Sequence, residues 1–173
     1  GELLWKRPFK ARSDVNAVTP LVVGQTVIAS GVEVGVVAVR ISKQGAQWMA
    51  EDAWLNDSTY FQLSNGAIVR DALFGLSSVG SGTYVIIVVK TGKPLWTGQP
   101  RSAANAAIQK AGDLLLGLED DGELLVVNGT DTSGFSPTHR YKVAETPTWS
   151  APAISGNRVF VKDVSTLALW TLN

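Results

Sequence analysis

The stretch Val69-Arg70-Asp71-Ala72-Leu73-Phe74 places a two-residue polar turn directly in front of a short apolar strand. The same pattern of turn and strand returns three more times, at 23–28, 111–115 and 155–160. The polar residues at the centres of the four turns are Gln25, Asp71, Asp113 and Asn157. Their separations are 46, 42 and 44 residues. A unit of this length is typical of the four-stranded blade of a β-propeller, which has roughly 40 to 50 residues.

A second set of residues repeats with the same period. Trp5, Trp48 and Trp96 are 43 and 48 residues apart, and Tyr141 follows Trp96 by 45 residues. One large aromatic side chain per repeat favours packing between adjacent blades, where each ring would bury roughly 200 Å². We therefore predict that Trp5, Trp48, Trp96 and Tyr141 are structural residues of the repeat. Two other tryptophans, Trp54 and Trp149, do not fit this spacing.

Short β-rich runs separated by glycine-containing turns fill each unit, which is the pattern of an antiparallel all-β protein. Asp120-Asp121-Gly122, for example, lies between two apolar runs and predicts a hairpin. The run Ser102–Gln109 has high helix propensity when it is taken alone. Because the repeat places this run at the innermost strand of the third blade, where small residues suit a crowded axis, we expect a strand there.

The two ends of the chain complement each other. After Trp149 the fourth unit has three strands and then ends, whereas Glu2–Lys6 resembles a last strand without a blade. We therefore predict one domain over residues 1–173, a propeller of four blades of about 44 residues. Its N-terminal strand completes the C-terminal blade, which removes exposed sheet edges. Two arrangements satisfy this: closure within one chain, or strand exchange in a homodimer whose two half-rings make eight blades.

Composition excludes several classes of function. Fifteen basic residues balance fifteen acidic ones, and no basic run is present, so we expect no nucleic-acid partner. The absence of cysteine removes disulfides, zinc–thiolate sites and cysteine nucleophiles. The longest apolar runs have about five or six residues, whereas a membrane-spanning helix needs about 20, so we expect no membrane span. His139 is the single histidine and has no recognisable base partner, so we expect no catalytic residue.

Polar residues precede the innermost strands at equivalent positions. Asn65 and Asn105 are 40 residues apart, and Thr19 lies in a similar place in the first unit. These side chains could surround the mouth of the propeller channel and bind a ligand together with Trp149. Alternatively, they satisfy backbone groups at turns and strand starts. The acidic run Glu119–Glu123 could offer oxygen ligands to calcium, but it lacks the spacing of a helix-loop-helix site, so we expect a solvated turn and no metal site.

The run Lys90-Thr91-Gly92-Lys93-Pro94-Leu95-Trp96 resembles the tryptophan-docking repeat of quinoprotein-like β-propellers, and 38–48 is a looser copy. The runs 156–163 and 169–173 are also similar to the pyrroloquinoline-quinone-binding-like repeat proteins of bacteria. Members of that family usually have seven or eight blades, and their dehydrogenases use the quinone, calcium and an aspartate base. The aspartate of the repeat falls on Val88 in one copy and on Arg40 in the other. No calcium site or base can be matched residue by residue.

These observations predict a non-catalytic binding or scaffold module with no cofactor, whose partner is an unknown protein or a small-molecule ligand. The alternative is a fragment of a quinone-dependent dehydrogenase whose active residues lie in other blades, with pyrroloquinoline quinone and calcium as its cofactors. The resemblance also implies a periplasmic or extracellular location.

Overall fold

The computed structural model describes residues 1–172, and its regular structure consists of β-strands and one short 3-10 helix, η1 (Arg12–Asp14). The strands form four antiparallel sheets, and within each sheet they follow one another in sequence order. The expected all-β fold of propeller blades is therefore confirmed. No helix in the described residues is long and apolar enough to cross a membrane.

Each sheet is one blade of the repeat. Blade 1 consists of β1 (Leu21–Val23), β2 (Thr26–Gly31), β3 (Gly35–Gln44) and β4 (Gln47–Asn56). Blade 2 consists of β5 (Ala67–Val69), β6 (Ala72–Ser77), β7 (Thr83–Val88) and β8 (Pro94–Thr97). Blade 3 consists of β9 (Ala106–Ala111), β10 (Leu114–Glu119), β11 (Glu123–Asn128) and β12 (Pro137–Lys142). Blade 4 has three strands, β13 (Ala153–Ser155), β14 (Arg158–Lys162) and β15 (Leu167–Thr171).

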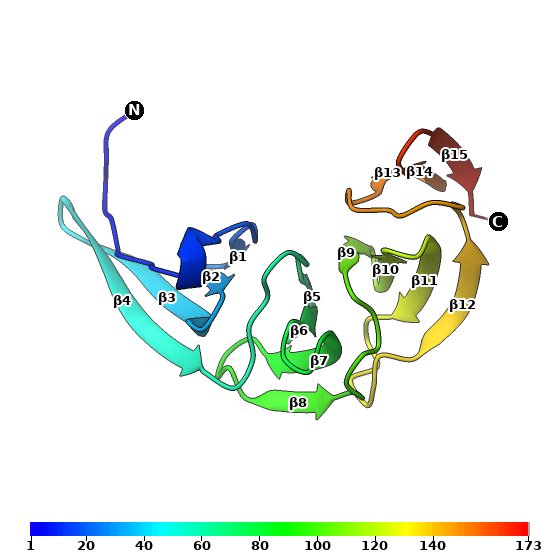
Figure 1. The fold of residues 1–173 in the computed structure, drawn as a ribbon. Coiled ribbons are helices and arrows are strands. Elements are labelled where there is room, and N and C mark those ends of the chain that lie inside the picture. The colour runs from blue at the N-terminus through cyan, green and yellow to red at the C-terminus, as the bar shows by residue number, and fades with distance from the viewer. Residues whose placement is uncertain (173) are drawn as a thin grey trace.

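The four blades follow one another along an open arc (Figure 1). The first strand of each blade lies toward the inside of the arc, and β4, β8 and β12 lie along its outside. Blades 1 and 4 are the two ends, and the termini lie far apart. In the described part of the chain, residues 2–6 belong to no sheet and β15 pairs only with β14. The three strands predicted after Trp149 are therefore present, but the N-terminal strand does not complete blade 4 within the chain, so the predicted closure in a single chain is not observed in residues 1–172.

The repeated turn joins the first two strands of every blade. It has two residues, and the first of them has a positive φ in all four copies: 56° at Gly24, 53° at Arg70, 65° at Gly112 and 62° at Gly156. Hairpin turns with this backbone favour glycine at the first position. The turn therefore explains why three of the four copies have glycine before their central polar residue. The run with high helix propensity supplies β9, which begins at Ala106.

Buried side chains fill the three spaces between adjacent blades. Ile28 of blade 1 and Leu73 of blade 2 belong to one apolar cluster. Phe74 of blade 2 and Leu115 of blade 3 belong to the next. The third cluster joins blades 3 and 4 through Leu116 and Val159. Since side chains alternate across a strand, blades 2 and 3 each present one apolar face to the blade before them and the other to the blade after them.

Candidate binding surfaces

Three of the four predicted ligand-binding residues lie just before the innermost strands. The backbone N–H of Thr19 donates a hydrogen bond to Oδ1 of Asn65 over 2.9 Å. The hydroxyl of Ser64 donates to Oδ1 of Asn105 over 2.7 Å. Trp149 lies apart from these bonds, before β13, and 62% of it is exposed. The amide oxygens of both asparagines thus tie one blade to the next, and ligand binding by Thr19, Asn65, Asn105 and Trp149 stays a prediction.

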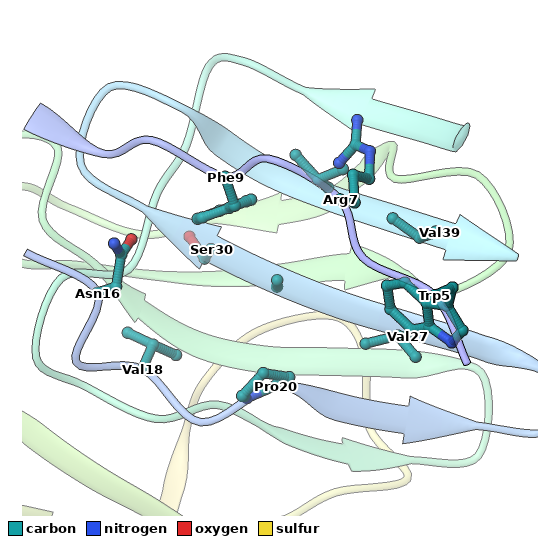
Figure 2. A pocket seen from close by; sticks show the side chains of 11 residues that line it. Trp5, Arg7, Phe9, Asn16, Val18, Pro20, Val27, Ser30 and Val39 are labelled. Carbon is teal, nitrogen blue, oxygen red and sulfur yellow. The ribbon is translucent and has the colours of Figure 1, made fainter. Parts of the chain in front are cut away.

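An apolar hollow lies on the end face of blade 1. It has a volume of about 400 Å³ and lies between the N-terminal segment and the sheet (Figure 2). Strands β2 and β3 supply its floor with Val27, Ala29, Val37 and Val39. Trp5 and Phe9 of the N-terminal segment cover part of this floor. We call this hollow the blade 1 pocket.

An ion pair holds the N-terminal segment over blade 1. The guanidinium of Arg7 lies 2.7 Å from the carboxylate of Asp52 on β4. Further along the segment, Ala11 is buried, and the backbone N–H of Arg12 donates to the carbonyl of Val32. Within residues 1–172 the segment therefore lies against blade 1 without pairing with any strand, and its residues line the blade 1 pocket.

The end face of blade 4 has an apolar centre, which the exposed basic residues Arg158 and Lys162 flank on β14. In the register of this sheet Phe160 lies opposite Leu169 on β15 and opposite Ala153 on β13, so the three side chains share one face. Leu167 and Leu169 are 71% and 52% exposed. Val159 and Val161, which alternate with Phe160, point the other way into the cluster shared with blade 3. One face of blade 4 is therefore buried, whereas the other has no blade beside it.

A buried polar pair crosses the interface between blades 2 and 3. The hydroxyl of Tyr84 donates a hydrogen bond to Oε1 of Glu119 over 2.7 Å, and both residues are 6% exposed. Burial raises the pKa of Glu119, and the hydrogen bond from Tyr84 opposes this rise. Burial also raises the pKa of Tyr84, and the charge of Glu119 adds to that rise. The pair thus favours a neutral tyrosine that donates to the carboxylate.

Glu119, Asp121 and Glu123 place their carboxylate oxygens within 4.8 Å of one another at the β10–β11 hairpin. The guanidinium of Arg140 on β12 lies 2.9 Å from Glu123 and 3.9 Å from Glu119. The acidic group therefore already has two partners, the guanidinium of Arg140 and the hydroxyl of Tyr84. The donor set therefore does not fit calcium well, because a bound cation would have to compete with Arg140.

The aromatic side chains of the repeat fall into two groups. Trp96 lies opposite Ile86 and packs against the cluster between blades 2 and 3. The equivalent position in blade 1, opposite Ala38, holds Trp54, whose indole N–H donates to the carbonyl of Val89.

Trp48 lies instead near the tip of the β3–β4 hairpin, opposite Lys43, whose ammonium group is 5.5 Å from its ring. Tyr141 is exposed on β12, and its ring stacks on that of His139 at 6.0 Å. The regular spacing of tryptophans in the sequence indicates Trp48 and not Trp54. The reason is that the β3–β4 hairpin of blade 1 is longer than its counterpart in blade 2: β3 and β4 have ten residues each, whereas β7 has six.

The fold is similar to several solved β-propellers. No protein-family model matches the sequence, and no curated protein matches it. The crystal structure of BamB from Moraxella catarrhalis aligns over 86% of this chain and 43% of its own, with a TM-score of 0.63 and 16% identity. The WD40 β-propeller domain of Doa1 aligns over 85% of this chain and 48% of its own, with a TM-score of 0.56 and 15% identity.

The computationally designed protein Ika4 aligns over 100% of this chain and 99% of its own, with a TM-score of 0.68 and 11% identity. This chain therefore spans less than half of BamB and of the Doa1 domain, and nearly the whole of Ika4. Identities this low establish the fold alone. The protein is a β-propeller of repeat type.

Proposed function

We propose that this chain is a non-catalytic scaffold module that binds an extended protein strand at the free edge of blade 4. The observation that carries the proposal is β15, which pairs with β14 on one side and, among residues 1–172, with no strand on the other. A free edge presents unpaired backbone groups that a further strand can bind, and neighbouring pockets add specificity for its side chains. Leu169 and Trp170, which are 52% and 42% exposed, lie on this edge strand.

The chain's own residues 2–6 provide a probe with the right pattern. They belong to no sheet, and Leu3 and Leu4 are 74% and 49% exposed. A labelled peptide of residues 1–8 therefore tests the edge by fluorescence anisotropy. The protein used carries Leu3→Pro together with Leu4→Pro, so that its own N-terminal segment cannot occupy the edge. Since neighbouring residues alternate in their hydrogen bonding to an antiparallel partner, one of the two prolines must remove a ladder bond in either register.

We expect saturable binding of the wild-type peptide to this variant. A peptide with the same two prolines is the matched control and should bind at least tenfold more weakly. Equal binding of the two peptides, or no saturation by the wild-type peptide, would contradict the proposed strand-binding function. A small molecule bound at the inner end through Asn65 and Asn105 is a second possible ligand of the same scaffold.

The cofactor alternative has its own test. In this proposal neither pyrroloquinoline quinone nor calcium raises the melting temperature, because a cation at the β10–β11 hairpin would have to displace Arg140 from its ion pair with Glu123. A calcium-dependent rise in melting temperature, together with a visible absorption band of bound quinone, would favour the dehydrogenase fragment. The resemblance to quinoprotein-like repeats supports a bacterial protein of the periplasm or the cell exterior.

A further inference from the structure

Each blade has one face whose burial depends on the blade before it. This face includes the second residue after the central polar residue of the repeated turn: Val27, Leu73, Leu115 and Val159. Leu73, Leu115 and Val159 are all 0% exposed, each in the cluster shared with the preceding blade. Val27 has no preceding blade and lines the blade 1 pocket. The pocket is therefore one half of an interface between blades.

The opposite face depends on the following blade. Its residues at the next position of the repeat are Ile28, Phe74, Leu116 and Phe160. Ile28, Phe74 and Leu116 are at most 3% exposed, whereas Phe160 is only partly buried. Phe160 thus belongs to the other half of an interface of the same kind. One end of the arc lacks a preceding blade, and the other lacks a following one.

The complete interface between blades 2 and 3 shows how the two halves would fit. There Phe74 shares a cluster with Leu115 and Val127 of the next blade. Val27 and Val39 occupy the positions of Leu115 and Val127, and they line the blade 1 pocket. By the same equivalence Phe160 is the side chain that should fill this pocket.

The N-terminal segment lies over the face of blade 1 that a preceding blade would cover. In blade 2 the fourth strand places Trp96 opposite Ile86, against the cluster shared with blade 3. Trp5 similarly lines the blade 1 pocket, in front of blade 1. In blade 4 the residue equivalent to Ile86 is Leu169, since Ile86 lies opposite Phe74 and Leu169 lies opposite Phe160. The equivalence therefore places Trp5 beside Leu169.

We infer that blade 4 of a second copy of this chain binds between the N-terminal segment and blade 1, with its Phe160 in the blade 1 pocket and its β15 paired with residues 2–6. The inference rests on the strand-binding edge proposed above and names its occupant. Each chain carries both halves of such an interface between blades, one at each end of the arc. Two copies related by a two-fold axis therefore make two identical contacts and close a ring. The BamB and Doa1 propellers, of which this chain spans less than half, agree with a ring of about twice its length.

Sedimentation equilibrium at micromolar concentration tests the inference with the full chain. We expect twice the monomer mass of 18.4 kDa for the wild type. Phe160→Asp and Leu169→Asp should each raise the dissociation constant of the dimer at least tenfold, because a charge would enter an apolar contact. Leu95→Asp is the matched control, since Leu95 is 49% exposed on β8, away from both ends of the arc, and this variant should remain dimeric.

Circular dichroism reports whether each variant is folded, and Leu169→Asp, at an exposed position, keeps the test valid if Phe160→Asp does not fold. A wild-type mass of 18.4 kDa at all concentrations would overturn the inference. So would a folded Leu169→Asp variant that remains as dimeric as the Leu95→Asp control. Peptide binding by the proline variant together with a monomeric wild type would retain the strand-binding function and exclude the second copy.

Discussion

The interface between blades 2 and 3 and the two ends of the arc are built from the same repeat positions but have different surroundings. Phe74 is 0% exposed, whereas Phe160, its equivalent in blade 4, is only partly buried. Leu115 is 0% exposed, whereas its equivalent Val27 lines a pocket. The difference lies in the presence of a neighbouring blade and not in the type of side chain. An apolar residue at a repeat position therefore indicates where a neighbour is required.

The largest expected effect compares the two phenylalanines directly. Phe74→Ala should lower the free energy of unfolding by about 3–5 kcal/mol, because it leaves a cavity in a fully packed cluster. Phe160→Ala should cost about 1 kcal/mol or less when the protein is diluted to a monomer, since part of the ring already contacts solvent. Urea unfolding at low protein concentration measures both. Equal losses would show that blade 4 is already packed against another surface within the chain.

A second comparison concerns two glycines at the same repeat position. A Cβ at Gly75 would overlap the ring of Phe61, whereas at Gly117 the nearest atom, in Phe135, lies 3.6 Å away. Gly75→Ala should therefore cost about 1–3 kcal/mol through overpacking, and Gly117→Ala should be nearly neutral. Thermal unfolding of the two variants checks this. A Gly75→Ala variant as stable as the wild type would mean that Phe61 can move out of the interface.

The buried pair Tyr84–Glu119, inside the interface between blades 2 and 3, predicts a pH dependence of stability. Burial raises the pKa of Glu119 above its ordinary value of 4.5. Just above that pH the folded protein still holds a proton that the unfolded chain has lost, so this group lowers stability as the pH rises through the window up to the folded pKa. Glu119→Gln cannot titrate but can still accept the hydrogen bond from Tyr84.

The stability of Glu119→Gln relative to the wild type should therefore increase as the pH rises from about 4.5, and then level off. Urea unfolding of both proteins across this range gives the difference, from which all other titrating groups cancel. A difference that is independent of pH would contradict the raised pKa.

The smallest expected effect concerns the ion pair that holds the N-terminal segment at one end of the arc. Asp52→Asn should cost about 1 kcal/mol or less, because Asp52 is 66% exposed and surface ion pairs contribute little. The loss should also diminish at high salt. Thermal unfolding at low and high salt measures it. A loss of several kcal/mol would mean that Arg7 is essential for the packing of blade 1.

The sequence predicts the repeat, the number of blades and the missing strand because turn residues and apolar alternation are local features. It does not predict which tryptophan lies between blades 1 and 2. Spacing indicates Trp48, whereas the longer β3–β4 hairpin places Trp54 opposite Ala38. The spacing of repeats does not reveal that one hairpin is longer than the equivalent hairpin of the next blade.

The candidate surfaces are less accessible to prediction than the fold. The equivalence of Asn65 and Asn105 follows from spacing, but their bonds to Thr19 and Ser64 depend on how adjacent blades meet. The blade 1 pocket depends on the course of residues 5–20 over the sheet, which no periodic pattern specifies. A pocket formed by irregular backbone requires the three-dimensional structure.

The most direct measurement of the central claim, that the two ends of the arc fit each other, is a disulfide cross-link between them. The chain has no cysteine, so Leu3→Cys combined with Thr171→Cys introduces only one possible pair of positions. With Trp5 beside Leu169, these two residues also lie side by side across the antiparallel strands. Mild oxidation should give a covalent dimer of twice 18.4 kDa on a non-reducing gel, while each single variant remains largely uncross-linked. A disulfide formed only within one chain, or no disulfide at all, would contradict the account.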